Sequence, residues 1–417
     1  MDHLREQGVK AGVLNVTMFR PFPSDLIASL LAGKKGVTVL ERLDQPLAVD
    51  PPLLREIRAA MGQAVENGRA AAPARRRFSL PTNGSTPLPY PSLPALSADQ
   101  VPDFWAAGFG FGSRDLQAGD LVAAVEHMRG GDRSRRHYYI GVDFIRKDTR
   151  LPKLQVWQDK LQEAYPDIGD RALPPSSQIN LLPKDAVSLR IHSVGGWGAI
   201  TMGKNVALTA FELFGMHVKA NPKYGSEKKG QPTTFYAVLS HEEVRPNAEL
   251  KYVNVVLAPD GNVFKHSNPL AGLARGGVFV IQSDRPVEEV WSGFPEYIRR
   301  DIRDRDIKVY ALDGFGIAND EASDAELRYR MQGAAFMGAF FRASPLLGQE
   351  GMSEERLFEG IEDQMRRKFG KKGDRVVQDN VRVIRRGFDE IVEVLPIEGG
   401  GADEPTQAPA AHMPSQM

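Results

Sequence analysis

The stretch from Val187 to Asn205 combines residue types that bind anions. An alternating apolar run predicts a strand over Val187–Ser193, a cluster of glycines follows, and an apolar periodicity predicts a helix over residues 199–214. Glycine lets a ligand approach the backbone closely, and the start of a helix offers unpaired N–H groups and the positive end of the helix dipole. The pattern is typical of a phosphate site. It is equally typical of a tight strand-to-helix turn whose glycines serve backbone geometry only.

Eight residues of this stretch are candidates for contact with a bound ligand. Lysine supplies a positive charge, threonine and asparagine supply hydrogen-bond donors, and tryptophan supplies a flat apolar surface. The candidate cofactor-binding residues are Gly195, Gly196, Trp197, Gly198, Thr201, Gly203, Lys204 and Asn205. We assign no catalytic residue and no metal ligand, because the histidines lack the spacing of a metal site.

Three kinds of nucleotide site can be compared with these residues. A dinucleotide fingerprint would use Gly196 and Gly198, but Thr201 replaces its third glycine, and no acidic residue stands about 20 positions later. A P-loop is closer, because Gly198 to Lys204 has the G-x-x-x-x-G-K spacing, although Asn205 replaces the Mg²⁺-binding Ser or Thr. The third kind holds a nucleotide by its phosphates without hydrolysis, and coenzyme A fits its requirements.

The composition excludes several classes of protein. A chain of 417 residues with 42% hydrophobic and 25% charged residues is a soluble globular chain of two or three domains. Lys+Arg and Asp+Glu each number 53, so no charge excess favours nucleic acid or a membrane surface. The absence of cysteine excludes disulfides, thiolate nucleophiles and cysteine-bound clusters on this chain. Because no membrane span or signal-peptide pattern is present, we expect a cytoplasmic protein.

Residues 1–69 predict an incomplete α/β piece that looks like the end of a domain. The expected elements are a strand over Gly12–Met18, a helix over Ser24–Ala32 capped by Ser24, a strand over Val37–Arg42 and a helix over Pro51–Val65. Two strands cannot cover both faces of a sheet, so we expect a partner for this piece. Residues 70–100 are rich in Pro and Ala and predict a linker, in which Arg75–Arg77 form a solvated basic patch.

Residues 101–183 predict a connecting segment. It contains a second glycine cluster, GFGFGSRD, with glycines at 108, 110 and 112, which suits a turn as well as a ligand loop. A helix over Gln117–Met128 and a strand over His137–Val142 are expected to follow.

Residues 184–395 predict a doubly wound α/β domain with C-terminal helices, and residues 396–417 predict a disordered tail. The expected strands are Val187–Ser193, Met216–Lys219, Thr234–Ser240, Val253–Leu257, Val278–Gln282 and Ile307–Leu312. The expected helices are 199–214, 287–304, Leu327–Phe341, Glu354–Phe369 capped by Ser353, and Asp374–Ile391. Ligands of such sheets lie beyond the carboxyl ends of the strands, where the turn after Ser193 falls.

Several motifs in the same order resemble the 2-oxoacid:acceptor oxidoreductase family, and within it the fused pyruvate:ferredoxin (flavodoxin) oxidoreductases. RIHSVGGWGAITMGKN (Arg190–Asn205) is similar to the opening of the family's gamma domain. The resemblance continues through Asn221–Ser240, Lys265–Ser283 and Met365–Ile391. GFGFGSRD resembles the segment that joins the second domain to the gamma domain, and NVTMFRPFPSDLI (Asn15–Ile27) with Val37–Ala48 resembles the end of the transketolase-C-like second domain.

The resemblance implies oxidative decarboxylation of a 2-oxoacid with coenzyme A as co-substrate. Thiamine diphosphate, Mg²⁺ and iron–sulfur clusters are then expected on partner subunits or missing segments, with ferredoxin or flavodoxin as the electron acceptor of an oligomeric enzyme. The chain is expected to be a middle section of that enzyme, as a split subunit or a fragment. The resemblance implies coenzyme A contacts at Gly196–Gly198 and Thr201–Asn205, and a structural Arg20 that pairs across a domain interface. Tyr224 and Lys228, on the loop KYGSEKKG after a strand, are candidates to close the site, but the favoured interpretation is an ordinary solvated charged loop.

A second hypothesis remains open. The chain would then be an autonomous P-loop-like nucleotide-binding or ATPase module, in which Asp313 takes the place of the Walker B aspartate.

Overall fold

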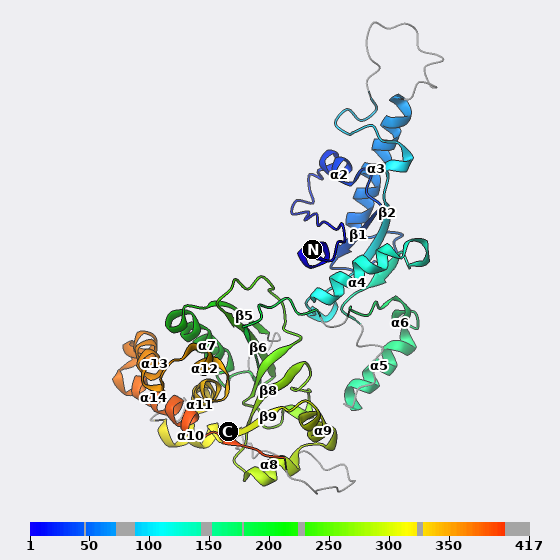
Figure 1. Cartoon of the computed structure of the whole chain (residues 1–417). Helices are drawn as coiled ribbons and strands as arrows, with labels where there is room; N and C mark the ends of the chain where they lie inside the picture. The colour runs from blue at the N-terminus through cyan, green and yellow to red at the C-terminus, as the bar shows by residue number, and fades with distance from the viewer. Residues whose placement is uncertain are drawn as a thin grey trace, which may run out of the picture. The chain divides into compact units, whose positions relative to one another are not determined.

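The computed structural model describes residues 1–45, 47–71, 88–142, 152–176, 179–223, 230–322 and 328–396. The chain forms two compact units, which we call unit 1 (Met1–Ile179) and unit 2 (Asn180–Met417) (Figure 1). The basic run Arg75–Arg77 and the expected site residues Tyr224 and Lys228 lie outside the described residues.

Unit 1 is built on a three-stranded parallel sheet. Its strands, in the order β1-β2-β3, are β1 (Gly36–Glu41), β2 (Asp103–Gly108) and β3 (His137–Tyr139). Its helices are α1 (Asp2–Glu6), α2 (Ser24–Leu31), α3 (Pro52–Ala71), α4 (Ala118–Arg129), α5 (Pro152–Ala164) and α6 (Ile168–Arg171), with 3-10 turns η2 (Ala98–Gln100), η3 (Phe111–Ser113) and η4 (Gly131–Arg133). Helices α2 and α3 pack on the face that carries Phe104 and Ala106. Helix α4 packs on the opposite face, against Trp105 and Tyr138.

Strand β2 was not expected from the sequence. The run from Phe104 to Ala107 is buried on both faces of the sheet, so it shows no apolar and polar alternation. It pairs with β1 from Gly36↔Asp103 to Glu41↔Gly108. The connection between α3 and β2 also returns to the core, because Asn67 Nδ2 donates to the carbonyls of Tyr90 at 2.8 Å and Leu93 at 3.0 Å.

The strand expected over Gly12–Met18 is wrong. Residues 9–19 form neither helix nor strand, and Val13 and Met18 are exposed by 78% and 56%. Apolar residues favour a strand when they can pair with a neighbouring strand in a partly buried sheet. Among the described strands of unit 1, none pairs with this segment. The expected pairing of Arg20 across a domain interface is also corrected. Arg20 pairs with Glu56 of α3 at 2.8 Å, within unit 1.

The expected capping of α2 by Ser24 is wrong as well. Ser24 is the first helical residue, Pro23 precedes it, and no side chain caps the helix start. Gly33, just after the helix, has the expected left-handed backbone with φ of 69°.

Unit 2 contains a seven-stranded mixed sheet in the order β10-β9-β8-β7-β4-β6-β5. Strands β4, β7, β8 and β9 are parallel, whereas β6 runs antiparallel to both β4 and β5, and β10 runs antiparallel to β9. The strands are β4 (Val187–Val194), β5 (His217–Lys223), β6 (Pro232–Ser240), β7 (Val253–Ala258), β8 (Leu273–Gln282), β9 (Lys308–Leu312) and β10 (Val392–Glu393). The six expected strands are therefore confirmed.

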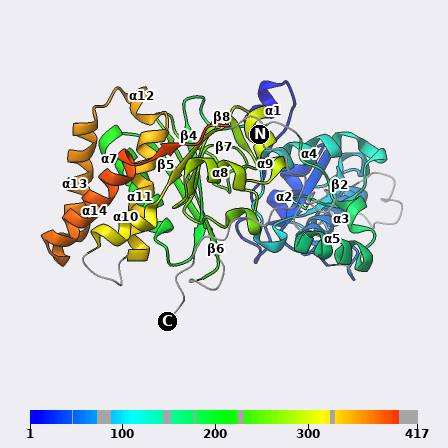
Figure 2. The same ribbon diagram turned by 90° about the horizontal axis from the view of Figure 1, so that it is seen from below.

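Helices cover both faces of this sheet, as Figure 2 shows. The helices are α7 (Ala199–Phe214), α8 (Val287–Gly293), α9 (Glu296–Asp304), α10 (Gly314–Glu321), α11 (Arg328–Ala343), α12 (Leu346–Glu350), α13 (Glu354–Phe369) and α14 (Asp374–Asp389), with 3-10 turns η6 (Val263–Lys265) and η8 (Gly370–Lys372). One core lies between the sheet and α7, α11, α13 and α14, and the other lies between the sheet and α8 and α9. The expected α/β fold of this part is confirmed.

Two helix expectations differ in their outcome. Helix α13 has the expected bounds, and the Ser353 hydroxyl accepts a hydrogen bond from the Arg356 N–H as its cap. The helix expected over residues 287–304 is instead two helices, α8 and α9, because Pro295 cannot supply an N–H within a continuous helix.

Glycines bring α11 and α14 into close backbone contact. A Cβ at Gly338 of α11 would lie 2.0 Å from the Ile384 carbonyl oxygen of α14. A Cβ at Gly387 of α14 would lie 2.0 Å from the Ala335 carbonyl oxygen of α11. Neither distance is compatible with a side chain, so this packing requires glycine at both positions.

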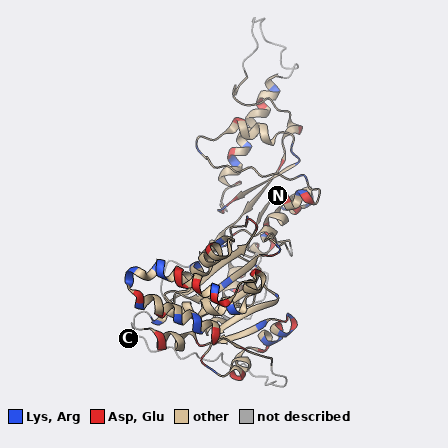
Figure 3. Ribbon diagram, turned by 60° about the vertical axis from the view of Figure 1, so that its left-hand side comes forward, with Lys and Arg blue, Asp and Glu red and all other residues tan. Residues whose placement is uncertain are grey.

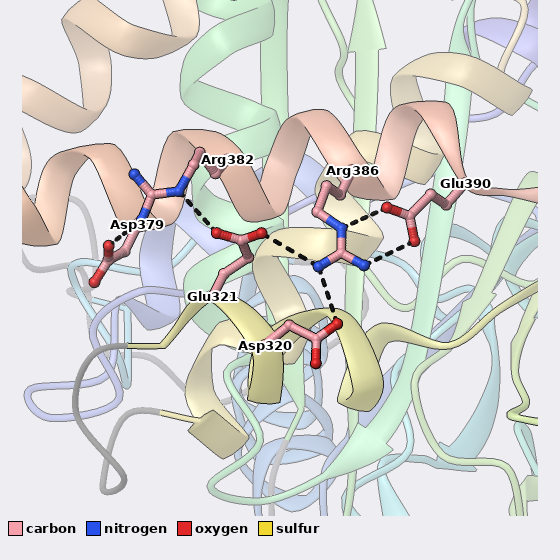
Figure 4. A network of polar contacts seen from close by, with 6 residues as sticks. All are labelled: Asp320, Glu321, Asp379, Arg382, Arg386 and Glu390. Carbon is pink, nitrogen blue, oxygen red and sulfur yellow. Dashed lines mark hydrogen bonds and ion pairs between the residues drawn. The ribbon is translucent and has the colours of Figure 1, made fainter.

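An ion-pair network on the outside of unit 2 fixes α10 to α14 (Figure 4). Its members are Asp320 and Glu321 of α10, Asp379, Arg382 and Arg386 of α14, and Glu390 just after α14. Arg386 reaches Asp320 at 3.1 Å and Glu321 at 3.2 Å. The carboxylate of Glu390, and then the other acids, raise the pKa of Arg386. Because these groups are partly exposed, the network contributes to orientation more than to stability.

Polar side chains of the central strand β4 point into the second core. Arg190 is 7% exposed and donates to the carbonyls of Pro269, at 2.8 Å, and Ala271. The Nε2 atom of His192 is buried without a hydrogen-bond partner among the described residues. Burial, followed by the nearby charges of Arg190 and His266, lowers the pKa of His192 to about 3. His192 therefore stays neutral in the folded protein.

We predict that Gly387→Ala destabilises unit 2 by about 1–3 kcal/mol, because the new methyl group forces α11 and α14 apart. The matched control is Gly348→Ala in α12, where a Cβ meets nothing within 4 Å. Thermal unfolding measures both variants. Equal melting temperatures for the two variants would contradict the close packing described above.

We also predict that His192 makes the protein acid-sensitive. Its pKa is about 3 in the folded state and 6.5 as the ordinary value, so the unfolded state binds one more proton between these limits. Stability is therefore lost as the pH falls below about 6.5, by about 1.4 kcal/mol per pH unit from this group. Urea unfolding of the wild type and of His192→Gln between pH 7 and pH 4 measures the difference in slope. The same slope for both proteins would sink the prediction.

Candidate functional site

The turn after β4 is formed by glycine backbones. The Gly195 N–H donates to the Gln231 carbonyl at 2.8 Å and so extends the pairing of β4 with β6. The chain then reverses through Gly196 and Gly198, whose φ angles are 101° and 85°. The expected strand, turn and helix are confirmed, and Gly198 is the residue that precedes the first turn of α7.

Gly198 also has a packing role. A Cβ at Gly198 would lie 2.4 Å from the Arg330 carbonyl oxygen of α11, and a Cβ at Gly333 would lie 3.1 Å from the Gly198 oxygen. The turn therefore lies directly against the backbone of α11. This contact fixes the turn and sets the direction in which α7 starts.

The candidate residues on α7 divide between two sides of the helix. Thr201 and Lys204 are exposed on its first turns. Gly203 is buried, and a Cβ there would lie 2.4 Å from the Phe235 ring of β6. Asn205 is 6% exposed and also faces inward. The structure thus brings Thr201 and Lys204 to the surface beside the turn, while Gly203 and Asn205 lie on the packed side.

Asn205 connects α7 to α13. Its backbone carbonyl accepts from Gln364 Nε2 at 3.1 Å, and its side-chain oxygen accepts from the Lys368 ammonium group. Burial, followed by the charge of Lys204, lowers the pKa of Lys368. Lys368 of α13 is therefore held against the packed side of α7 through Asn205.

Lys368 was missed by the sequence analysis. Its basic neighbourhood stands out in the motif Met365–Ile391, but its contact with Asn205 spans 163 residues of sequence. Only the packing of α13 on α7 brings the two together.

Trp197 forms part of an aromatic wall. Its ring meets Phe315 of α10 edge-on, with centroids 5.2 Å apart, and Phe315 meets Tyr329 of α11 in the same way at 6.0 Å. Edge-to-face contacts of this kind hold the indole in place. Trp197 is therefore a fixed side of the turn.

The structure does not support the P-loop interpretation. In a P-loop, the glycine-rich segment wraps around phosphates before the helix begins, whereas here α7 already begins at Ala199. The buried Gly203 lies against Phe235. Asp313 caps α10 by accepting from the Gly316 N–H at 2.9 Å, and it accepts from Gln282 Nε2 at 3.1 Å. Sequence spacing alone had suggested a loop where the chain is helical.

Two further findings concern other classes of site. Within the described ranges, no group of three or more His, Asp or Glu residues is arranged to hold a metal ion. None of the described helices combines the length and the apolar character that crossing a membrane would require.

Comparison with known proteins gives two matching families. The family described as pyruvate ferredoxin/flavodoxin oxidoreductase matches residues 188–390, and pyruvate:ferredoxin oxidoreductase core domain II matches residues 1–72. The first range contains the turn, α7 and the helices that hold it.

Individual relatives match either nearly the whole chain or about half of it. The pyruvate-flavodoxin oxidoreductase of Trichormus variabilis is 22% identical over 99% of this chain, which spans only 29% of that relative's length. The common gamma subunit of the pyruvate/ketoisovalerate oxidoreductases of Thermococcus litoralis is 25% identical over 49% of this chain and 97% of its own. The solved pyruvate oxidoreductase subunit PORC of Thermotoga maritima covers 50% of this chain and 98% of its own, with 22% identity and a TM-score of 0.38.

The matches to both families lie in the order expected from the motifs. The chain spans less than a third of the length of the pyruvate-flavodoxin oxidoreductases that it matches. Residues 188–390 therefore match the pyruvate ferredoxin/flavodoxin oxidoreductase family, and residues 1–72 match core domain II of the pyruvate:ferredoxin oxidoreductases.

Proposed function

We propose that this chain contributes the coenzyme A-side gamma unit to a 2-oxoacid:ferredoxin or flavodoxin oxidoreductase. The whole enzyme would convert a pyruvate-like 2-oxoacid to acyl-CoA. The observation that carries the proposal is the glycine turn between β4 and the start of α7, with Thr201 and Lys204 exposed on the first turns of that helix. The family match supplies the reaction class.

The place of the turn in the sheet supports this assignment. After β4 the chain moves to β5 and β6 on one side, and then returns to β7 on the other side of β4. The carboxyl ends of the parallel neighbours β4 and β7 thus lie where the strand order reverses, which is where open α/β sheets bind ligands. The turn at Gly195–Gly198 follows β4 at this point.

Each candidate residue has a role in the proposed site. The backbones of Gly195, Gly196 and Gly198 let phosphate oxygens approach the start of α7, where N–H groups and the helix dipole favour an anion. Thr201 and Lys204 donate to the phosphates, and Trp197 forms the side of the site.

The remaining residues act by positioning. Gly203 allows α7 to approach Phe235, and Asn205 holds the Lys368 ammonium group against α7. Burial first, and then the charge of Lys204, lowers the pKa of Lys368. A phosphate bound near these lysines would favour their charged forms.

The other cofactors belong to other parts of the enzyme in this proposal. Thiamine diphosphate with Mg²⁺ supplies the decarboxylation chemistry, and iron–sulfur clusters carry the electrons to ferredoxin or flavodoxin. This chain has no cysteine to bind an iron–sulfur cluster and no G-D-G type motif for thiamine diphosphate with Mg²⁺. We therefore assign the clusters and thiamine diphosphate to partner subunits or domains. What this chain would do is hold coenzyme A by its phosphates and orient it toward those partners.

The surface is consistent with an assembly of this kind. Apolar side chains are exposed on one part of unit 1, including Leu26 and Leu30 on the outer side of α2. We propose that partner domains cover them in the oligomeric enzyme.

Positive and negative residues are interspersed along the chain (Figure 3), and their counts are equal, which gives no reason to propose nucleic acid or membrane as a partner. We place the assembly in the cytoplasm.

We predict that Lys204→Ala weakens coenzyme A binding by about ten- to a hundredfold, because a charge-assisted hydrogen bond at a helix start contributes about 1–3 kcal/mol. The matched control is Lys308→Ala, an exposed lysine at the amino end of β9 and therefore at the opposite edge of the sheet. Calorimetric titration with coenzyme A measures both. Removing the 3′-phosphate of the ligand should reduce affinity more than removing its thiol.

Two results would count against this assignment. One is an equal effect of Lys204→Ala and Lys308→Ala. The other is tight Mg²⁺-dependent binding of ATP with no response to coenzyme A, which would favour the nucleotide-hydrolysing alternative.

A further inference from the structure

A pocket lies in unit 1, and its residues are far in sequence from the turn after β4. It has a volume of about 390 Å³ and lies on the face of the three-stranded sheet that carries α2 and α3. Its floor is formed by Ala106 and Gly108 of β2, which share this face with Tyr139 of β3 because Gly108 pairs with Tyr139. Residues that follow β1, among them Leu43, Ala48 and Val49, form one wall of the pocket.

The pocket extends from Arg135, just before β3, to the carboxyl ends of the strands. β1 ends at Glu41, β2 at Gly108 and β3 at Tyr139, and the wall residues 43–45, 48, 49 and 51 come soon after β1. The second glycine cluster begins at Gly108, at the edge of the pocket, and its glycines at 110 and 112 have left-handed backbones. The sequence analysis left open whether this cluster is a plain turn or a ligand loop. Its position is the one at which open α/β sheets bind ligands.

The acidic residues around the pocket are occupied by structural contacts. Glu41 accepts from two backbone N–H groups at the start of α3, at 2.8 and 3.3 Å. Asp50 pairs with Arg58 at 2.9 Å and lies 3.6 Å from His137. Asp44 accepts from the Tyr139 hydroxyl at 3.0 Å. The three carboxylates are therefore already used by contacts within unit 1.

Two guanidinium groups at the rim remain without a strong acidic partner. Arg135 is exposed, and its side chain has no hydrogen bond or ion pair within the described part of the chain. Arg171 has a carboxylate neighbour in Asp167, but the two are 4.0 Å apart and Asp167 is largely exposed. Arg171 also lies close to Tyr139, whose pKa is raised by burial first and then by Asp44, while Arg171 opposes that rise. The rim therefore carries guanidinium groups, and the small residues Ala106 and Gly108 lie in the same pocket.

We propose that this pocket binds a nucleotide, with its phosphates between Arg135 and Arg171 and its base against the Ala106–Gly108 floor. Guanidinium groups present paired donors that match phosphate oxygens. Small residues on a strand leave the sheet surface open to a flat ring, and Val49 and Pro51 supply apolar wall on the other side. The volume falls within the range of small-molecule sites. This site is independent of the coenzyme A site proposed for unit 2.

The test is titration of the full chain with ADP and with inorganic pyrophosphate. ADP binding is expected, and each of Arg135→Gln and Arg171→Gln should weaken it about tenfold or more, because each removes charge-assisted hydrogen bonds. Arg133→Gln is the matched control, since Arg133 is exposed in the same segment but does not line the pocket. The arginine variants are compared in the Lys204→Ala background, in which phosphate binding at the turn of unit 2 is weakened. Pyrophosphate should bind more weakly than ADP, because it lacks the base.

Three results would overturn the proposal. The first is no ADP binding at millimolar concentration. The second is ADP binding that survives both arginine substitutions in this background, which would place the ligand elsewhere. The third is equal affinity for ADP and pyrophosphate, because the floor would then have no role in recognition.

Discussion

The contact between the turn after β4 and helix α11 is the constraint on which the rest of unit 2 depends. Gly198 and Gly333 allow two backbones to meet where any side chain would separate them. The same helix α11 meets α14 through Gly338 and Gly387. A run of glycines along one helix therefore joins the central strand to the last helix of the fold. Interiors are packed densely enough that a single methyl group at such a contact must displace its neighbours.

This arrangement explains why the C-terminal helices belong to the candidate site. Helix α13 carries Gln364 and Lys368, which bind the backbone and the side chain of Asn205 on α7. The contact of Lys368 with α7 thus depends on a helix that follows the turn by more than 150 residues. The ion pairs between α10 and α14 add orientation from outside, with Arg386 bridging Asp320, Glu321 and Glu390 (Figure 4). A phosphate site at the start of α7 would be held in shape by this whole layer.

The sequence predicted those features whose causes are local. Helix α7 was placed at its bounds because its apolar period and its flanking glycines agree, and α13 because Ser353 marks its start. Predictions failed where burial or pairing decides. Strand β2 was missed because it is apolar on both faces, and the strand over Gly12–Met18 was wrong because no neighbouring strand receives it. The Walker A spacing misled because residue spacing does not distinguish a loop from the first turns of a helix. Lys368 was missed because tertiary packing alone brings it to α7.

The central claim is that the turn and the start of α7 hold the phosphates of coenzyme A. Hydrogen exchange of backbone amides in the full chain, with and without saturating coenzyme A, tests it most directly, because a bound phosphate must accept from those N–H groups. The account predicts slower exchange for Gly195–Thr201 and for the end of α13 around Lys368 in the presence of the ligand. Unchanged exchange of Gly195–Thr201 when coenzyme A is demonstrably bound would contradict it.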